Sequence, residues 1–147
     1  MYFLFLFLSN ENNLLILWAE KELLTTKLHK RMENRKLRMG IIGGGLDGFI
    51  GSVHIRAALM ESQIELVCGC FSINPEISYK SGRYFSVPDD RIYETYPEIF
   101  EKEALLPDDK RMQFVVVVTP NHVHYEPAAM ALYHGYDVVI DKPMIFS

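Results

Sequence analysis

The chain has 147 residues, of which 49% are apolar and 23% are charged, and its formal net charge is −4. This length fits one domain, and the composition supports a packed core and excludes a wholly disordered chain. The acidic balance argues against a dedicated nucleic-acid binder. Two cysteines, Cys68 and Cys70, exclude a disulfide framework and fall short of a four-ligand zinc site, so we expect both in the core.

Residues 1–36 are predicted to be an extension outside the fold. The apolar run over residues 1–8 follows no basic residue and precedes no small-residue cleavage site, so it does not make a signal peptide. Residues 14–30 favour an amphipathic helix, for which a membrane-surface anchor is one interpretation. The other is upstream sequence translated by mistake, with the true start at Met32 or Met39. No apolar run reaches the ~20 residues of a membrane span, and we expect a cytoplasmic protein.

From residue 37 onward, short apolar runs alternate with helical stretches. We expect strands over residues 37–42, 64–70, 114–118 and 138–140, and a short one is an option over residues 91–93. We expect helices over residues 49–60, 74–84, 95–105 and 125–134, with Asn74 and Thr95 as N-caps. This alternation predicts an α/β fold with a doubly wound parallel sheet of the Rossmann type over residues 37–147.

A glycine-rich loop, Gly43-x-Gly45-x-x-Gly48, joins the first expected strand to the first expected helix. The first glycine permits a tight turn, and the second lets the backbone approach a pyrophosphate. The third allows close packing of helix and strand. Phosphate charge would then meet the N–H groups at the start of the helix. A strand–loop–helix setting favours a ligand site over a plain glycine turn.

Gly51 is a second candidate for the third glycine. In that case residues 46–50 are extra loop length, and the amides that meet phosphate include those of Phe49 and Ile50. The end of the second strand carries no Asp or Glu to bind ribose hydroxyls, but Ser72 is placed there to donate a hydrogen bond. The sequence therefore leans to NADP, or to either nicotinamide cofactor.

Two later strands also end in polar turns. The third leads into Thr119-Pro120-Asn121, at the edge of the sheet where ligands bind in parallel α/β folds, and Asn121 can also cap the helix that follows. Two histidines follow there without a third metal ligand, so we expect no metal site. The fourth strand leads into Asp141-Lys142-Pro143. Lys142 is either an ordinary lysine paired with Asp141 or a group that binds a reacting oxygen.

The order and spacing of these motifs resemble the nucleotide-binding half of the glucose–fructose oxidoreductase / inositol dehydrogenase / rhizopine-catabolism (Gfo/Idh/MocA) family. The resemblance rests on residues 39–45 (MGIIGGG), 51–54 (GSVH), 65–67 (ELV), 118–124 (VTPNHVH) and 141–143 (DKP). Members of that family bind NAD or NADP and oxidise or reduce a carbinol on a sugar, cyclitol or related small molecule. The resemblance implies that Lys142 contacts the reacting oxygen and that Pro143 can be cis. The family's Glu-Lys-Pro motif has Asp141 here in place of Glu.

The resemblance also implies a second, substrate-binding domain that this chain does not reach, and a homo-oligomer in the full-length form. We therefore expect an NAD(P)-dependent oxidoreductase seen as its cofactor-binding half, inactive alone, with Lys142 as catalytic residue. The candidate cofactor-binding residues are Gly43, Gly45, Gly48, Phe49, Ile50, Ser72, Thr119, Pro120, Asn121, His124, Asp141, Lys142 and Pro143. Two alternatives stay open: a free-standing nucleotide-binding module that acts through a partner chain, and, less favoured, a methyltransferase.

Overall fold

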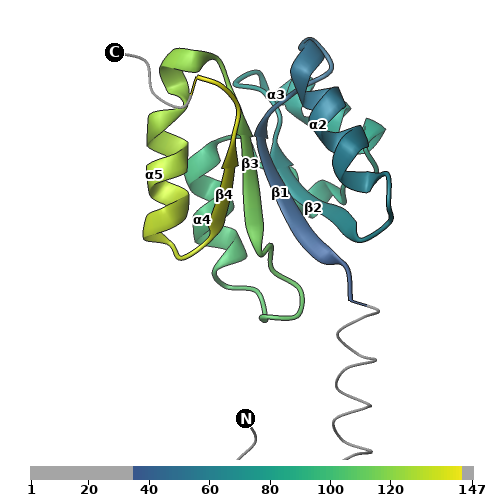
Figure 1. Ribbon diagram of the computed structural model, residues 1–147, viewed down its shortest axis with the longest axis vertical. Helices are drawn as coiled ribbons and strands as arrows, with labels where there is room; N and C mark the ends of the chain where they lie inside the picture. The colour runs from purple at the N-terminus through teal and green to yellow at the C-terminus, as the bar shows by residue number, and fades with distance from the viewer. Residues whose placement is uncertain (1–34, 144–147) are drawn as a thin grey trace, which may run out of the picture. The chain divides into compact units, whose positions relative to one another are not determined.

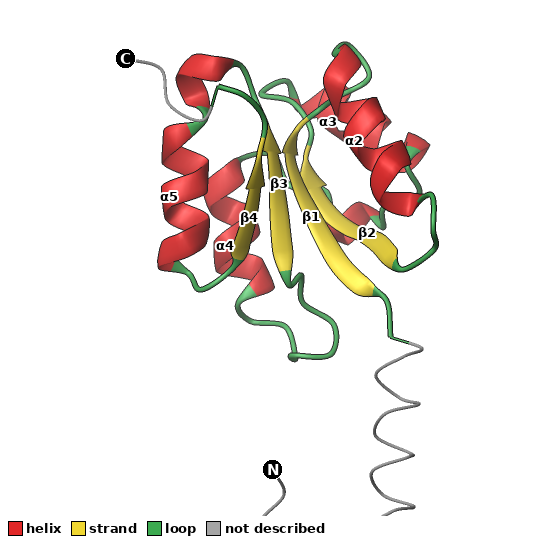
Figure 2. Cartoon of the chain, in the orientation of Figure 1, coloured by secondary structure: helices red, strands yellow, loops and turns green. Residues whose placement is uncertain are grey.

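The computed structural model describes residues 35–143, so the helix expected over residues 14–30 lies outside the described residues. Four parallel strands form one sheet in the order β2-β1-β3-β4, with helices on both faces (Figure 2). The elements are β1 (Leu37–Gly43), α2 (Phe49–Leu59), β2 (Ile64–Cys70), α3 (Pro75–Tyr84), η1 (Asp89–Arg91), α4 (Tyr96–Glu103), β3 (Phe114–Val118), η2 (Asn121–Val123), α5 (Tyr125–Tyr133) and β4 (Asp137–Ile140). None of the helices in this range is long and apolar enough to span a membrane.

The central strand β3 is apolar throughout because it is buried on both faces. Val115 and Val117 belong to a buried cluster with Phe100 of α4. Val116 belongs to a second buried cluster with Ile55 of α2. Side chains alternate between the two faces of a strand, so a central strand that is covered on both sides favours apolar residues at every position. The two clusters confirm the predicted doubly wound arrangement, which Figure 1 shows with α4 and α5 on one side and α2 and α3 on the other.

The structure differs from the sequence prediction at one short segment. The strand considered over residues 91–93 is instead the 3-10 turn η1 followed by a single parallel bridge between Ile92 and Gly69. The Tyr93 N–H donates to the Gly69 carbonyl at 2.9 Å. One bridge on the outer edge of β2 is too little to propagate a ladder, because η1 turns the chain away immediately before it.

Two predicted helix caps are also corrected in part. Thr95 occupies the N-cap of α4, but its side chain makes no capping bond, and the Glu98 carboxylate accepts the Glu94 N–H at 3.2 Å instead. Asn121 does not cap α5, because the turn η2 intervenes and His124 stands at the N-cap position. Asn74 does cap α3, since its side-chain oxygen accepts the N–H of Glu76 at 3.0 Å.

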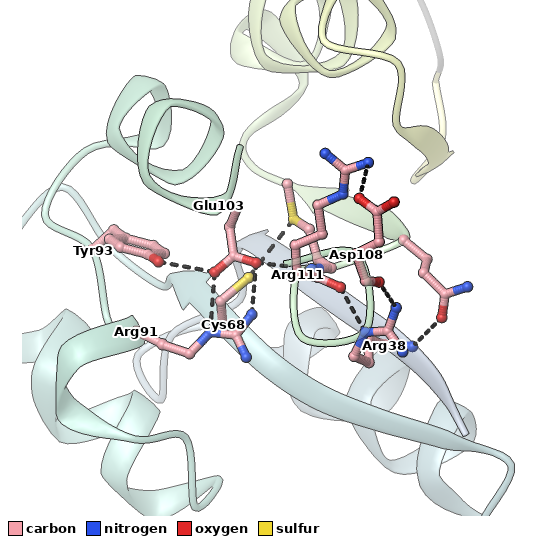
Figure 3. A network of polar contacts seen from close by, with 9 residues as sticks. Arg38, Cys68, Arg91, Tyr93, Glu103, Asp108 and Arg111 are labelled. Carbon is pink, nitrogen blue, oxygen red and sulfur yellow. Dashed lines mark hydrogen bonds and ion pairs between the residues drawn. The ribbon is translucent and has the colours of Figure 1, made fainter. Parts of the chain in front are cut away.

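Glu103, at the end of α4, is a fully buried carboxylate (Figure 3). Arg91 donates to both of its oxygens, from Nε at 3.0 Å and from Nη2 at 2.6 Å. The Tyr93 hydroxyl and the Met112 N–H add bonds of 2.9 Å and 2.8 Å. Burial and the nearby carboxylate raise the pKa of Tyr93 and keep its hydroxyl a donor. The buried charge is therefore fully satisfied, and its bond from Met112 lies two residues before β3 begins.

Candidate cofactor-binding and active site

The turn after β1 depends on glycine because of its backbone conformation. Gly43 and Gly44 have φ angles of 84° and 76°, in the left-handed region. A Cβ on Gly43 would also lie 2.8 Å from the carbonyl oxygen of Val118. The start of this turn therefore needs glycine on both counts, as the motif predicts.

The close packing of helix on strand belongs to Gly51 and not to Gly48. A Cβ on Gly51 would overlap the Cα atom of Gly44, whereas one on Gly48 would meet nothing closer than the Gly45 carbonyl oxygen at 3.5 Å. Gly51 therefore takes the packing role of the third glycine, but the loop is not extended to residue 50, because α2 already begins at Phe49. Gly48 is the N-cap of α2.

The N-terminus of α2 is open to a ligand. No side chain caps it, and no acidic residue stands in its first turn. Phe49 is 82% exposed and Ile50 is 37% exposed, so the first helical turn borders solvent. The unsatisfied N–H groups at such a helix end, together with the helix dipole, make a site for a phosphate group.

Two hydrogen bonds fix the glycine loop against the rest of the sheet edge. The Gly45 N–H donates to the Phe71 carbonyl at 2.9 Å, and the Leu46 N–H donates to the Ser81 hydroxyl at 3.0 Å. Ser81 lies on α3, and its hydroxyl donates in turn to the Ile77 carbonyl at 2.6 Å. Ser81 has no counterpart among the predicted site residues, because an isolated serine in a helix carries no sequence signal for this role.

The end of β2 places Ser72 at the same edge. Its side-chain oxygen accepts the Asn74 N–H at 3.2 Å, and the following Ile73 is 99% exposed. Cys68 and Cys70 are both free and buried, as expected of core residues. Burial, with a smaller effect of the Glu98 carboxylate, raises the pKa of Cys70 to about 11. Both thiols therefore stay protonated near neutral pH, in keeping with a packing role in the core.

The turn after β3 carries an unsatisfied polar atom. Thr119 Oγ1 is buried and has no hydrogen-bond partner among the described residues. A buried hydroxyl without a partner is costly, so its presence calls for an explanation, of which a functional role is one. Pro120 and Asn121, next in the chain, are exposed at the same edge. This orphan hydroxyl fits a cofactor lying along the turn.

In the turn after β4, Lys142 is exposed to solvent, whereas Asp141 is partly buried. The Asp141 N–H donates to the Val117 carbonyl at 3.1 Å, which ties the turn to β3. Asp141 Oδ1 lies 3.7 Å from His54 Nε2 of α2, and within the described part of the chain no ion pair joins Asp141 to Lys142. The Lys142–Pro143 peptide bond is cis. The simpler interpretation, a lysine paired with its neighbouring aspartate, therefore does not describe this turn.

His124 is placed differently from the other predicted cofactor residues. It is 1% exposed, and its two ring nitrogens face backbone carbonyls of the chain itself. Its neighbour His122 is exposed. Between residues 35 and 143, no group of three or more His, Cys, Asp or Glu side chains could hold a metal ion.

Parallel strands bring all four turns to one edge of the sheet. The glycine loop, the Ser72 turn, the Thr119 turn and the Lys142 turn each follow the carboxyl end of a strand, and these ends lie together at the top of Figure 1. An open helix end, an orphan hydroxyl and an exposed ammonium are thereby gathered where ligands bind in open α/β sheets. This arrangement can hold a nucleotide and present a cation to a second molecule.

Comparison with known proteins agrees with this geometry. Residues 37–147 match the model of an oxidoreductase family with an NAD-binding Rossmann fold, GFO_IDH_MocA. The uncharacterized oxidoreductase YfiI of Bacillus subtilis (strain 168) is 32% identical over 119 residues, which are 80% of this chain and 30% of that protein.

Solved structures of an inositol dehydrogenase homolog from Azotobacter vinelandii are similar as well. The complex with NAD+ is 37% identical with a TM-score of 0.73, over 78% of this chain and 29% of that chain. The complex with NADH and myo-inositol has the same identity and TM-score, over 78% of this chain and 30% of that chain. The chain thus spans about 30% of the length of these relatives.

Proposed function

Because the chain belongs to the GFO_IDH_MocA oxidoreductase family with its NAD-binding Rossmann fold, we propose that it is the cofactor-binding part of an enzyme that oxidises a CH–OH group on a sugar, cyclitol or related polyol, or reduces the corresponding carbonyl. The observation that carries this proposal is the meeting of an open helix N-terminus, the orphan Thr119 hydroxyl and the exposed Lys142 ammonium at one sheet edge.

The glycine loop is the proposed pyrophosphate site. Gly43 and Gly45 let the backbone come close, and the amides of Phe49 and Ile50, at the start of α2, point their partial positive charge at the phosphates. The Gly48 N–H is used within the loop, where it donates to the Gly45 carbonyl at 2.9 Å. The loop is held from behind by the bonds to α3 and the end of β2, so it is preorganised before the cofactor arrives.

The other turns are proposed to follow the cofactor across the sheet edge. Ser72 is offered to the ribose side, where the lack of a carboxylate leaves room for NAD or NADP. Thr119, Pro120 and Asn121 lie toward the nicotinamide, with the Thr119 hydroxyl gaining the partner it lacks. When bound, the nicotinamide supplies the hydride chemistry.

The Asp141-Lys142-Pro143 turn is proposed to meet the reacting end of the substrate. The Lys142 ammonium is exposed beside the Thr119 turn and is free of Asp141, whose carboxylate lies near His54. Such a cation can donate a hydrogen bond to a hydroxyl or carbonyl oxygen and stabilise the charge that develops there. It can also carry the hydroxyl proton to or from solvent.

The proposed polyol substrate class is supported by the hydrogen bond that Lys142 can donate to a hydroxyl or carbonyl oxygen and by one similar protein. The inositol dehydrogenase homolog of Azotobacter vinelandii was crystallised with myo-inositol, a polyol of the proposed kind. Because this chain spans about 30% of that protein, the remaining substrate contacts and a homo-oligomer interface are proposed to lie in a longer form. We infer that the 147-residue chain alone binds cofactor and turns over little, and a cytoplasmic location stays a prediction.

The test is Lys142→Ala in the longest form of the protein, assayed beside the unchanged protein for NAD(P)-dependent polyol oxidation. We expect turnover to fall by about 10²–10⁴-fold, the usual contribution of a positioned proton-transfer group, with an unchanged dissociation constant for NADH. Lys110→Ala, at an exposed lysine in the loop before β3, is the matched control and should change neither.

Unchanged turnover in Lys142→Ala would contradict the assigned role. A module that only binds nucleotide for a partner chain would give a third pattern, with NADH bound normally by every variant and no turnover in any of them.

A further inference from the structure

His124 lies between the two turns that are proposed to flank the reacting end of the cofactor. Its Nε2 atom is 2.7 Å from the carbonyl oxygen of Thr119, at the end of β3. Its Nδ1 atom is 3.0 Å from the carbonyl oxygen of Pro143, in the turn after β4. The ring is 1% exposed, so these contacts are shielded from water. One buried side chain thus spans two turns that are far apart in sequence.

The chemistry of the two contacts makes the ring a donor to the backbone. A carbonyl oxygen only accepts, and an imidazole nitrogen donates only when it carries a proton. A neutral ring has one N–H and satisfies one carbonyl, whereas a protonated ring satisfies both. In every state at least one turn is held by a hydrogen bond in a dry environment, where such a bond is stronger than in water.

Apart from His124, few described contacts fix these two turns on the face where the cofactor is proposed to bind. Thr119 leaves its hydroxyl without a partner among the described residues, and Pro143 is adjacent to the exposed Lys142. The described tie from the β4 turn to β3 is the 3.1 Å bond from the Asp141 N–H to the Val117 carbonyl. A contact at the Pro143 carbonyl therefore bears directly on where the backbone of Lys142 sits.

We propose that His124 is a positioning residue: with a proton on Nδ1, its ring donates to the Pro143 carbonyl and fixes the Lys142 turn against the Thr119 turn. This role rests on the proposed function of Lys142. It replaces the direct cofactor contact expected of His124 from the sequence, since both ring nitrogens are directed at the protein backbone.

Two substitutions separate the two ends of the ring. Asn places an amide N–H₂ near the position of Nδ1, and Gln places one near the position of Nε2. His124→Asn can therefore keep the bond to Pro143, and His124→Gln can keep the bond to Thr119. His124→Ala keeps neither, and His122→Asn is the control at an exposed histidine in the same turn.

The first measurement is amide hydrogen exchange in the 147-residue chain. We expect the Asp141 amide to exchange about tenfold faster in His124→Ala and in His124→Gln, the effect of losing one buried hydrogen bond. The rate should return toward the wild-type value in His124→Asn, and the Val116 and Ile41 amides of the central strands should not change. Acceleration spread evenly over all strands, or none at Asp141 in any variant, would overturn the proposal.

The second measurement is steady-state kinetics in the longer, active form. His124→Gln should lower kcat without changing the KM for the cofactor, and His124→Asn should recover part of the loss. If Lys142→Ala lowers turnover and His124→Gln does not, the positioning role is wrong while the proposed function stands. If Lys142→Ala has no effect, the proposed function fails, and the exchange result at Asp141 still decides whether His124 holds the turn.

Discussion

The buried polar groups at the two ends of β3 differ in their hydrogen bonding. Before the strand begins, the Glu103 carboxylate is buried and accepts four hydrogen bonds from Arg91, Tyr93 and Met112 (Figure 3). After the strand ends, the Thr119 hydroxyl is buried and has no partner among the described residues. A satisfied buried charge holds loops together, whereas an unsatisfied hydroxyl keeps its bonding capacity for another molecule.

Polar groups that hold the fold together differ from candidate site groups in their hydrogen bonds and not in their residue type. Glu103 is charged and buried and Arg91 is charged and half-buried, features that often mark active sites, yet the bonds between them are internal to the chain. Lys142 is exposed, and the carboxylate of its neighbour Asp141 lies 3.7 Å from His54 Nε2. Polar groups that lack hydrogen-bond partners within the chain therefore indicate the candidate cofactor site more clearly than buried charged residues do.

The largest expected effect is on stability, at the satisfied end. Arg91→Met leaves the Glu103 carboxylate buried without its main partner, which typically costs about 3–5 kcal/mol. We expect the free energy of unfolding to fall by that amount in urea titrations, with an unchanged NADH dissociation constant for the folded fraction. Arg83→Met breaks the exposed pair with Asp89 and should have little effect. Equal losses in the two variants would show that the buried network is not what holds this end together.

A smaller effect, on both stability and binding, is expected at the glycine turn. Gly51→Ala forces a methyl group into the backbone of Gly44, and overpacking of this kind costs about 1–3 kcal/mol. The displaced turn should also weaken NADH binding, as measured by fluorescence titration. Gly48→Ala is the control for stability, because its φ of −113° suits alanine and its Cβ has room. Equal destabilisation by both would restore the packing role to Gly48.

The smallest effect is expected at Thr119, where stability and binding should move in opposite directions. Thr119→Val removes the orphan hydroxyl at nearly the same volume, so the ligand-free protein should become more stable by about 1 kcal/mol. NADH binding should weaken by about fivefold, the effect of one lost hydrogen bond. Thr119→Ser keeps the hydroxyl and should preserve affinity. A Val variant that binds NADH as well as the wild type would remove Thr119 from the cofactor site.

Local patterns were enough to predict most of the elements. The apolar runs placed β2 at Ile64–Cys70 and β3 at Phe114–Val118. β3 is apolar because it is buried on both faces, whereas β2 is buried only toward its carboxyl end. Asn74 likewise predicted where α3 begins, because its side chain caps that helix. The short strand offered as an option over residues 91–93 is only a single bridge, since that bridge depends on a neighbouring strand and not on the residues of the segment itself.

The sequence predicted which turns form the candidate site, but it did not predict the contacts between side chains of different elements. Strand–turn–helix order alone brings the glycine loop, Thr119 and Lys142 to one edge of the sheet, so the sequence determined which residues meet there. It did not determine that Gly51 packs on Gly44, that Ser81 anchors the glycine loop, or that His54 faces Asp141. Those contacts join different elements, and only the packing of helices on the folded sheet decides which side chains touch.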